Sequence, residues 1–163
     1  MKVLVAVASR HGATREIADA IGLALNSEGL TASVVPVADA GDLAGYDAFV
    51  LGSAVYMGRW LDPARTFVEH GSEALSRRPT WLFSSGPIGT PLRPEEREAV
   101  DVDDVISKTR ARGHKLFAGK LDKHALGFGE RAVMLAFHAD DGDYRDWEEI
   151  ALWARDVAQE LRG

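Results

Sequence analysis

The chain has 163 residues and a mass of 17.7 kDa, so we expect a single domain over residues 1–163 that buries a core of its own. Its 19 Lys and Arg against 25 Asp and Glu give a formal net charge of −6, which argues against binding to nucleic acid. Because it has no cysteine, disulfides, thiol nucleophiles, thiolate metal sites and iron–sulfur clusters are excluded, and any redox chemistry must come from a bound organic cofactor.

The N-terminal segment does not look like a targeting signal. Its apolar run, Val3 to Ala8, is shorter than the core of a secretory signal peptide and is followed by polar residues. No stretch approaches the roughly 20 apolar residues that a membrane-spanning helix needs. We therefore expect a cytoplasmic protein.

Short apolar runs alternate with amphipathic stretches along the chain. The runs are continuous rather than alternating with polar residues, which is typical of parallel strands buried on both faces. We predict strands at Lys2–Ala8, Thr31–Val37, Ala48–Gly52, Thr80–Ser84 and Leu116–Leu121. Helices are predicted from Thr14 to Leu25, from Asp62 to about Leu75, after Asp101 and after Asp146.

Particular residues indicate where the helices begin and end. Gly29 is placed to end the first helix. Asp62 and Pro63 are suited to the cap and the first helical position of the second. Asp146, with Glu149 three residues later, is a capping box for the last.

The alternation of strands and helices predicts an α/β fold with a doubly wound, five-stranded parallel sheet of order 2-1-3-4-5. The second strand then lies at an edge of the sheet, where Pro36 is tolerated. In such sheets ligands bind beyond the carboxyl ends of the strands. The loops that follow the strands are therefore the candidate site.

The turn after the first strand, Ser9-Arg10-His11-Gly12-Ala13-Thr14, leads directly into a helix. Free backbone N–H groups at a helix N-terminus, with the hydroxyls of Ser9 and Thr14, can hold a phosphate. An ordinary capped turn is equally compatible with these residues. Several other sites are excluded, because the sequence has no Rossmann glycine fingerprint, no P-loop and no G-x-S-x-G elbow.

Two further loops suit a flat ligand. The loop after the third strand is Ala54-Val55-Tyr56-Met57-Gly58-Arg59-Trp60. Tyr56 and Trp60 can stack on an aromatic ring, or alternatively pack on the following helix. The loop after the fourth strand, Ser85-Gly86-Pro87-Ile88-Gly89, can bring backbone groups against a ligand edge. Phosphate, ring face and ring edge each have a place on adjacent strands.

With these residues the sequence resembles the flavodoxin family over nearly the whole chain. The family's phosphate loop, Thr/Ser-x-Thr-Gly-x-Thr, matches at Ser9, Gly12 and Thr14, and departs from the pattern at His11. The chain looks most like the flavodoxin-type, menaquinone-dependent protoporphyrinogen dehydrogenases. The segments that carry this likeness are residues 9–18, 52–60, 117–121 and 144–148.

The resemblance implies FMN as the cofactor. Residues 9–14 would then hold the phosphate, residues 54–58 would lie along one face of the ring, and residues 85–89 would border its edge. The backbone of Gly58 would meet the flavin N5. Arg59 follows a loop without Asp or Glu, so we expect it to make the flavin potential less negative, unless it points to solvent.

The implied function is an oxidoreductase that oxidises protoporphyrinogen or a related hydrogen donor and passes the electrons to a quinone or another acceptor. One alternative is a flavodoxin-type electron shuttle that docks to protein redox partners and has no substrate of its own. Another is a flavin-free binding module, for which the departure at His11 is the best support.

Three further features bear on partners. Ser107–His124 holds six Lys and Arg against one Asp, which suits either an acidic substrate or partner or an ordinary solvated face. The apolar segment Leu126 to Phe137 contains one cation, Arg131, so burial or a homodimer contact is favoured and any membrane contact should be weak. The histidines show no ligand spacing, and no metal site is predicted.

Overall fold

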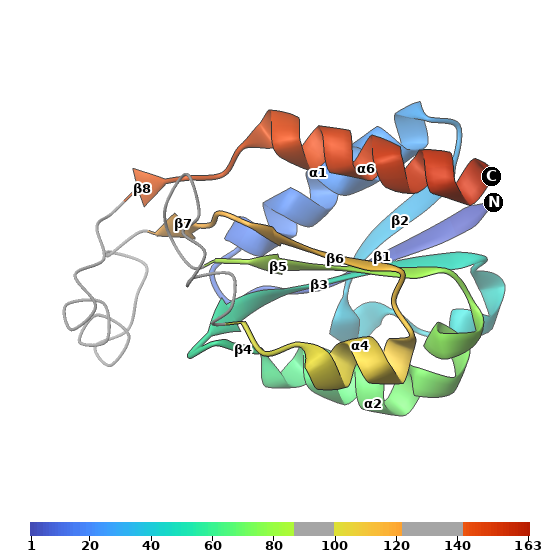
Figure 1. Ribbon diagram of the computed structural model, residues 1–163, viewed down its shortest axis with the longest axis horizontal. Coiled ribbons are helices and arrows are strands. Elements are labelled where there is room, and N and C mark those ends of the chain that lie inside the picture. Colours follow the sequence, from blue (N-terminus) through green and yellow to red (C-terminus); the bar gives the residue numbers. More distant parts are fainter. Residues whose placement is uncertain (87–99, 122–141) are drawn as a thin grey trace.

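The computed structural model describes residues 1–86, 100–121 and 142–163, and within them a parallel sheet lies between two layers of helices (Figure 1). The five long strands are β1 (Lys2–Ala8), β2 (Thr31–Pro36), β3 (Ala48–Tyr56), β5 (Thr80–Ser85) and β6 (Gly113–Phe117). Their order is β2-β1-β3-β5-β6 with every neighbouring pair parallel, which confirms the predicted doubly wound sheet.

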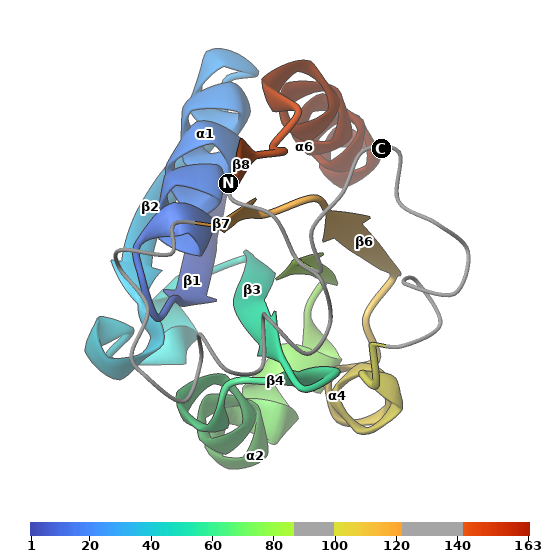
Figure 2. The ribbon, with the colours of Figure 1, turned by 90° about the vertical axis from the view of Figure 1, so that its left-hand side faces the viewer.

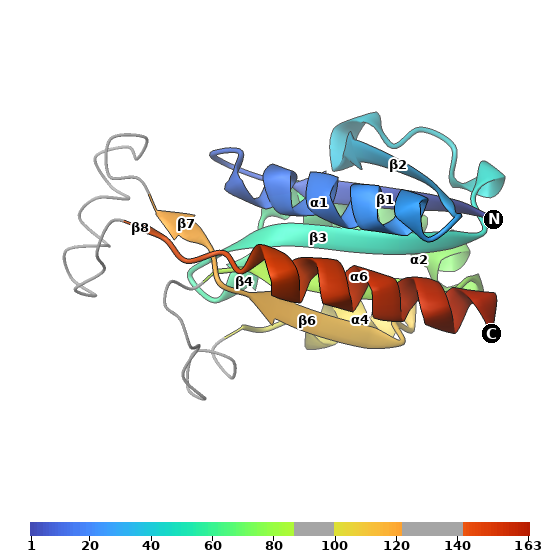
Figure 3. The same cartoon turned by 90° about the horizontal axis from the view of Figure 1, so that it is seen from above.

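Two shorter strand pairings lie at one end of this sheet. The two-residue strand β4 (Arg59–Trp60) folds back antiparallel on the end of β3. Strands β7 (Lys120–Leu121) and β8 (Gly142–Asp143) form a separate antiparallel ribbon. Figure 3 shows β4, this ribbon and the start of α1 at the same end of the molecule, opposite the two chain termini.

The helices cover both faces of the sheet. Helices α1 (Ala13–Ser27) and α6 (Trp147–Arg162) lie on one face, and α2 (Asp62–Arg77) and α4 (Asp103–Thr109) lie on the other (Figure 1). Two short 3-10 helices, η1 (Val37–Asp39) and η2 (Leu43–Gly45), connect β2 to β3.

The core has two apolar layers because successive side chains of a strand point to opposite faces. In β1, Val3, Val5 and Val7 pack toward α1 and α6, whereas Leu4 and Ala6 pack toward α2 and α4. All five are buried, which explains the unbroken apolar run in the sequence. This two-sided burial fixes the direction of β1, and hence the place where it ends.

Two helix boundaries agree with the sequence. Gly29 has a φ of +86°, and the next residue, Leu30, donates its N–H to the Leu25 carbonyl at 3.2 Å, so α1 ends in a Schellman motif. Asp146 caps α6, because its Oδ1 accepts the Glu149 N–H at 3.0 Å.

The predicted cap of α2 is wrong. The capping residue is Leu61 rather than Asp62, and no side chain accepts a bond from the first turn. The N–H of Leu61 instead donates to Ser53 Oγ at 3.0 Å, so the chain turns into α2 one residue earlier. Asp62 and Pro63 are therefore the first two helical residues.

The predicted bounds of the fifth strand are also wrong. The apolar run Leu116–Leu121 straddles a break, and the strand is Gly113–Phe117 instead. Because β6 lies at an edge of the sheet, the polar residues in its first half are not enclosed by neighbouring strands on both sides. Lys120–Leu121 belongs to the separate ribbon. The other strands differ only at their ends: β3 reaches Tyr56, β5 reaches Ser85, and β2 ends at Pro36.

Candidate functional site

The carboxyl ends of three central strands bring the predicted site segments together. Ala8 of β1 pairs with Ser53 of β3, and Ala54 pairs with Ser85 of β5. Residues 9–14, 54–58 and 85–86 therefore lie at one end of the sheet, which faces the viewer in Figure 2. Pro87 and Gly89 lie outside the described residues, so their predicted place at the ring edge stays a prediction.

The turn after β1 presents backbone donors. Ser9 Oγ accepts the Gly12 N–H at 3.0 Å, which closes the turn, and Gly12 adopts a φ of +88° before the helix. The first helical bond runs from the Glu16 N–H to the Gly12 carbonyl at 3.1 Å. The N–H groups of residues 13–15 precede this bond and have no partner within the helix. Together with the helix dipole they suit an anion.

The side chains of this turn differ in accessibility. Thr14 is 2 % exposed, whereas Arg10, His11 and Gly12 are exposed and Ser9 is half-buried. The position that departs from the family pattern, His11, is therefore on the open side of the turn.

The loop after β3 is a tight hairpin. Tyr56 at the end of β3 pairs with Arg59 of β4, and the two residues between them, Met57 and Gly58, have φ values of +52° and +76°. Two successive positive values are typical of a type I′ turn, which favours Gly at its second position but rarely accepts Met at its first. Tyr56 and Met57 are both exposed at the tip.

Arg10 connects the first turn to this hairpin. Its guanidinium carbon lies 4.7 Å from the centroid of the Tyr56 ring, a cation–π contact. One face of Tyr56 is therefore covered by Arg10. A flat ligand can stack on the other face, or on this one after Arg10 has moved.

Trp60 differs from Tyr56. It is 3 % exposed and packs in the core layer of α2, so its predicted stacking on a ligand is wrong and the alternative, packing within the protein, is correct. Its Nε1 donates to Ser84 Oγ at 2.8 Å, and this hydroxyl lies 2.7 Å from His114 Nε2. Burial lowers the pKa of His114. The chain of bonds fixes the base of the hairpin to β5 and β6.

Asp101 is a neighbour of the hairpin that the sequence did not indicate. Its N–H donates to the Gly58 carbonyl at 2.7 Å, and it forms a parallel bridge with Arg59. Rotation of the peptide between Gly58 and Arg59 would break that hydrogen bond. The fold thus brings an acidic residue into register with Arg59, although none lies next to it in the sequence.

The start of the loop after β5 is held by the neighbouring strand. Gly86, with a φ of +91°, donates its N–H to the Phe117 carbonyl at 3.0 Å. Gly119 approaches so closely that a Cβ there would lie 3.3 Å from the Gly86 nitrogen. Ser85 is buried. The N–H of Gly86 is thus used within the protein, and its predicted role at a ligand edge would fall to other atoms of this loop.

The cationic run Ser107–His124 is largely used within the protein as far as the structure describes it. Lys108 bonds Glu69 and Asp104, and Lys115 bonds Glu149 at 2.7 Å. The Arg112 guanidinium lies 5.4 Å from the Trp81 ring centroid. These contacts favour the interpretation of the run as a structural and solvated face. The apolar segment Leu126 to Phe137 lies outside the described residues.

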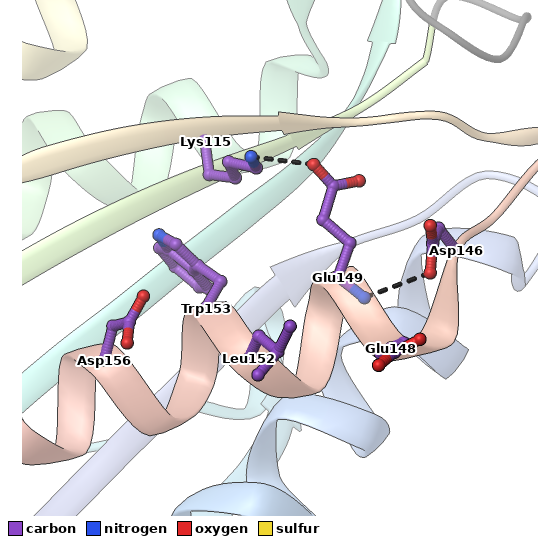
Figure 4. Close-up of a pocket in the computed structure, with 7 residues that line it drawn as sticks. All are labelled: Lys115, Asp146, Glu148, Glu149, Leu152, Trp153 and Asp156. Carbon is purple, nitrogen blue, oxygen red and sulfur yellow. Dashed lines mark hydrogen bonds and ion pairs between the residues drawn. The ribbon is translucent and has the colours of Figure 1, made fainter.

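A pocket of about 330 Å³ along α6 is not the predicted site (Figure 4). None of the predicted site residues lines it. Four of its seven lining residues are carboxylates beside a single Lys115, an environment that repels a phosphate. The lining residues are Lys115, Asp146, Glu148, Glu149, Leu152, Trp153 and Asp156.

The described residues offer neither a metal site nor a membrane-spanning helix. Within residues 1–86, 100–121 and 142–163, no group of three or more His, Asp or Glu side chains is arranged to hold a metal ion. In the same part of the chain, no helix combines the length and the apolar character that crossing a bilayer requires.

A doubly wound parallel sheet of order β2-β1-β3-β5-β6, with a helix N-terminus directly after its first strand, is the architecture of a flavodoxin-like α/β protein. The family described as "Flavodoxin domain" matches residues 4–147, so the chain belongs to the flavodoxin family.

The individual proteins that the chain resembles share a quarter or less of its residues. The chain is 25 % identical to protoporphyrinogen IX dehydrogenase (quinone) of Escherichia coli K12, over 97 % of this chain and 95 % of that one. Among solved structures, an archaeal flavodoxin has a TM-score of 0.69 at 15 % identity and covers 100 % of both chains. Flavodoxin 1 of Bacillus cereus has a TM-score of 0.66 at 18 % identity and covers 99 % of both. These structures share the fold.

Proposed function

We propose that residues 1–163 form one FMN-binding domain that works as an oxidoreductase. The observation that carries the proposal is the pairing of two features at one end of the sheet. Backbone N–H groups of residues 13–15 are free of helical partners, and the exposed Tyr56 ring is joined to the same turn through Arg10. A phosphate and a flat ring are the two parts of FMN that need such surroundings.

The described residues fit this cofactor in three places. Residues 9–14 would hold the phosphate, the hairpin of residues 54–58 would lie along the ring, and Ser85 and Gly86 would border its edge. Bound FMN supplies the electron-transfer chemistry, and the protein supplies position and electrostatics. The bonds that Asp101 and Ser84 make with Gly58 and Trp60 hold the base of this hairpin in place.

We further propose a two-electron oxidation of a hydrogen donor such as protoporphyrinogen, with a quinone or another small molecule as acceptor. The support is the likeness, over nearly the full length of both chains, to a protein named for that reaction. A second candidate is an electron shuttle that docks to a redox protein. The fold it shares with solved flavodoxins favours this candidate equally, because one fold hosts several functions.

The first experiment is a titration of the purified protein with FMN, followed by quenching of flavin fluorescence. Riboflavin, which lacks the phosphate, is the matched ligand. We expect FMN to bind at least about tenfold more tightly, the factor that 1.4 kcal/mol of phosphate interaction provides. Equal affinities, or no binding of FMN, would contradict the proposed phosphate site.

The second experiment separates enzyme from shuttle. The FMN-loaded protein is mixed with protoporphyrinogen and a quinone, and formation of the oxidised porphyrin is followed by its absorbance. Turnover above that of free FMN at the same concentration supports the enzyme. Its absence, together with reduction of the bound flavin in two resolved one-electron steps, supports the shuttle.

A further inference from the structure

The side chain of Arg145 joins distant segments beside the phosphate turn. It is 3 % exposed, although it lies in the connection between β8 and α6. Its Nη1 donates to the Ala13 carbonyl at 3.2 Å and to Glu16 Oε2 at 3.0 Å, both in the first turn of α1. Its planar group also lies 4.5 Å from the centroid of the Trp147 ring. A buried arginine thus touches the very turn that we propose for the phosphate.

The positive charge of Arg145 is already balanced. Asp143 accepts two bonds from it, at 2.9 Å from Nε and 2.7 Å from Nη2, and Glu16 adds a second carboxylate. These bonds raise the pKa of Arg145 and lower the pKa of Asp143. Because four of its five N–H groups face these partners, the guanidinium has little left to offer a ligand directly. Its effect on an anion must pass through the groups that it holds.

The bond to Ala13 has a geometric consequence. In a trans peptide the C=O and the following N–H point in opposite directions. The carbonyl of Ala13 shares its peptide plane with the N–H of Thr14, one of the three N–H groups that precede the first helical bond. Because Ala13 is the first residue of α1, its carbonyl is held both within the helix and by Arg145. The bond to Arg145 therefore reinforces the direction in which the Thr14 N–H points, out of the helix N-terminus toward an anion.

We propose that Arg145 is a positioning residue that holds the first peptides of α1 in the orientation that receives a phosphate. The ribbon of β7 and β8, which carries Asp143, then braces the phosphate turn from outside the sheet. This inference rests on the proposed FMN site, and it adds a residue 132 positions away from Ala13 in sequence.

The test compares affinities for FMN and riboflavin in Arg145→Gln and in the unaltered protein. If Arg145 positions these peptides, Arg145→Gln should bind FMN about tenfold or more weakly, as expected for the loss of charge-assisted hydrogen bonds. Its affinity for riboflavin should be unchanged. A merely structural role would lower both affinities alike. The matched control is Arg162→Gln, which removes a guanidinium that joins α6 to the far end of α1 through Glu28. It should leave the FMN-to-riboflavin ratio unchanged.

Two further variants make the result decisive. Arg145→Lys keeps the charge but cannot hold Asp143 and Ala13 together, so it should lose the preference for FMN as well. Full retention of the preference in this variant would show that charge alone matters and would overturn the positioning role. Circular dichroism shows whether Arg145→Gln folds. If it does not, Asp143→Asn serves instead, because it weakens the bonds that orient the guanidinium while Arg145 itself is retained. This variant should also lower the ratio of the affinity for FMN to that for riboflavin.

The outcomes separate the two proposals. An unaltered protein without a preference for FMN overturns the proposed phosphate site and this inference with it. A preference that persists in Arg145→Gln and Asp143→Asn overturns this inference alone.

Discussion

Replacing Ser84 by alanine tests how the hairpin beside the proposed site is held. The Ser84 hydroxyl is fully buried, accepts the Trp60 indole N–H at 2.8 Å and lies 2.7 Å from His114 Nε2. Without it, the indole N–H has no partner in a core position that water does not reach. An unsatisfied buried donor costs about 1–3 kcal/mol, and the lost bond to His114 adds about 1 kcal/mol. We expect the free energy of unfolding to fall by about 2–4 kcal/mol.

The measurement is urea denaturation of the flavin-free protein, in which the midpoint shifts at an unchanged m-value. The matched control is Ser76→Ala, because the exposed Ser76 hydroxyl donates to the Glu73 carbonyl at 3.1 Å and its loss should cost less than about 0.5 kcal/mol. A loss in Ser84→Ala no larger than in this control would refute the reasoning.

A double-mutant cycle identifies the atom responsible. Trp60→Phe removes the indole N–H, so deleting the Ser84 hydroxyl in that background no longer leaves a buried donor without a partner. We expect a coupling between the two substitutions of about 1–3 kcal/mol. Simple additivity would mean that Ser84→Ala acts through the small cavity it leaves and not through the hydrogen bond.

Three further predictions concern His114, the charges at the hairpin and the cap of α6. Ser84 Oγ accepts the indole N–H and lies within hydrogen-bond distance of His114 Nε2. Since burial lowers the pKa of His114, the unfolded chain binds a proton that the folded chain resists, and the free energy of unfolding should fall as the pH drops below 6.5; His114→Gln should flatten this slope. Arg59→Glu should make the FMN midpoint potential more negative, by at most on the order of 0.1 V, whereas Asp101→Asn should shift it the other way, as potentiometry can show. Asp146→Ala should lower the free energy of unfolding by about 1 kcal/mol, read from urea denaturation.

The sequence predicted the sheet well because the sheet depends on local patterns. The unbroken apolar run of Lys2–Ala8 is sufficient to place a strand buried on both faces, and β1 has these bounds. Gly29 ends α1 because it alone near that point adopts a positive φ without strain. Where the apolar pattern was ambiguous, as around β6, the observed bounds of the strand differ from the predicted ones. The polar start of β6 is compatible with a strand only because that strand lies at an edge, and its place in the sheet cannot be read from its own residues.

The candidate site was predicted only in part, because its segments follow from the fold whereas its contacts do not. The strand order brings residues 9–14 and 54–58 to one end of the sheet. Nothing in the residues near Trp60 indicates that its indole would meet Ser84 in another strand, so its burial could not be predicted from composition. Asp101 and Arg145 come from segments far along the chain. Residues 144–148 stood out in the sequence only as one of the segments that carry the family likeness.

The contacts found divide the proposed site into two separately supported parts. The turn of residues 9–14 is closed by Ser9 and held by Arg145 from the connection between β8 and α6. The hairpin of residues 54–58 is held from the opposite face of the sheet through Ser84 and Asp101. Among the described residues, the Arg10 guanidinium and the Tyr56 ring, both exposed, form a side-chain contact between the two parts. A site built in this way can keep its phosphate donors fixed while the hairpin adjusts to the ring, because the movement of one part does not strain the support of the other.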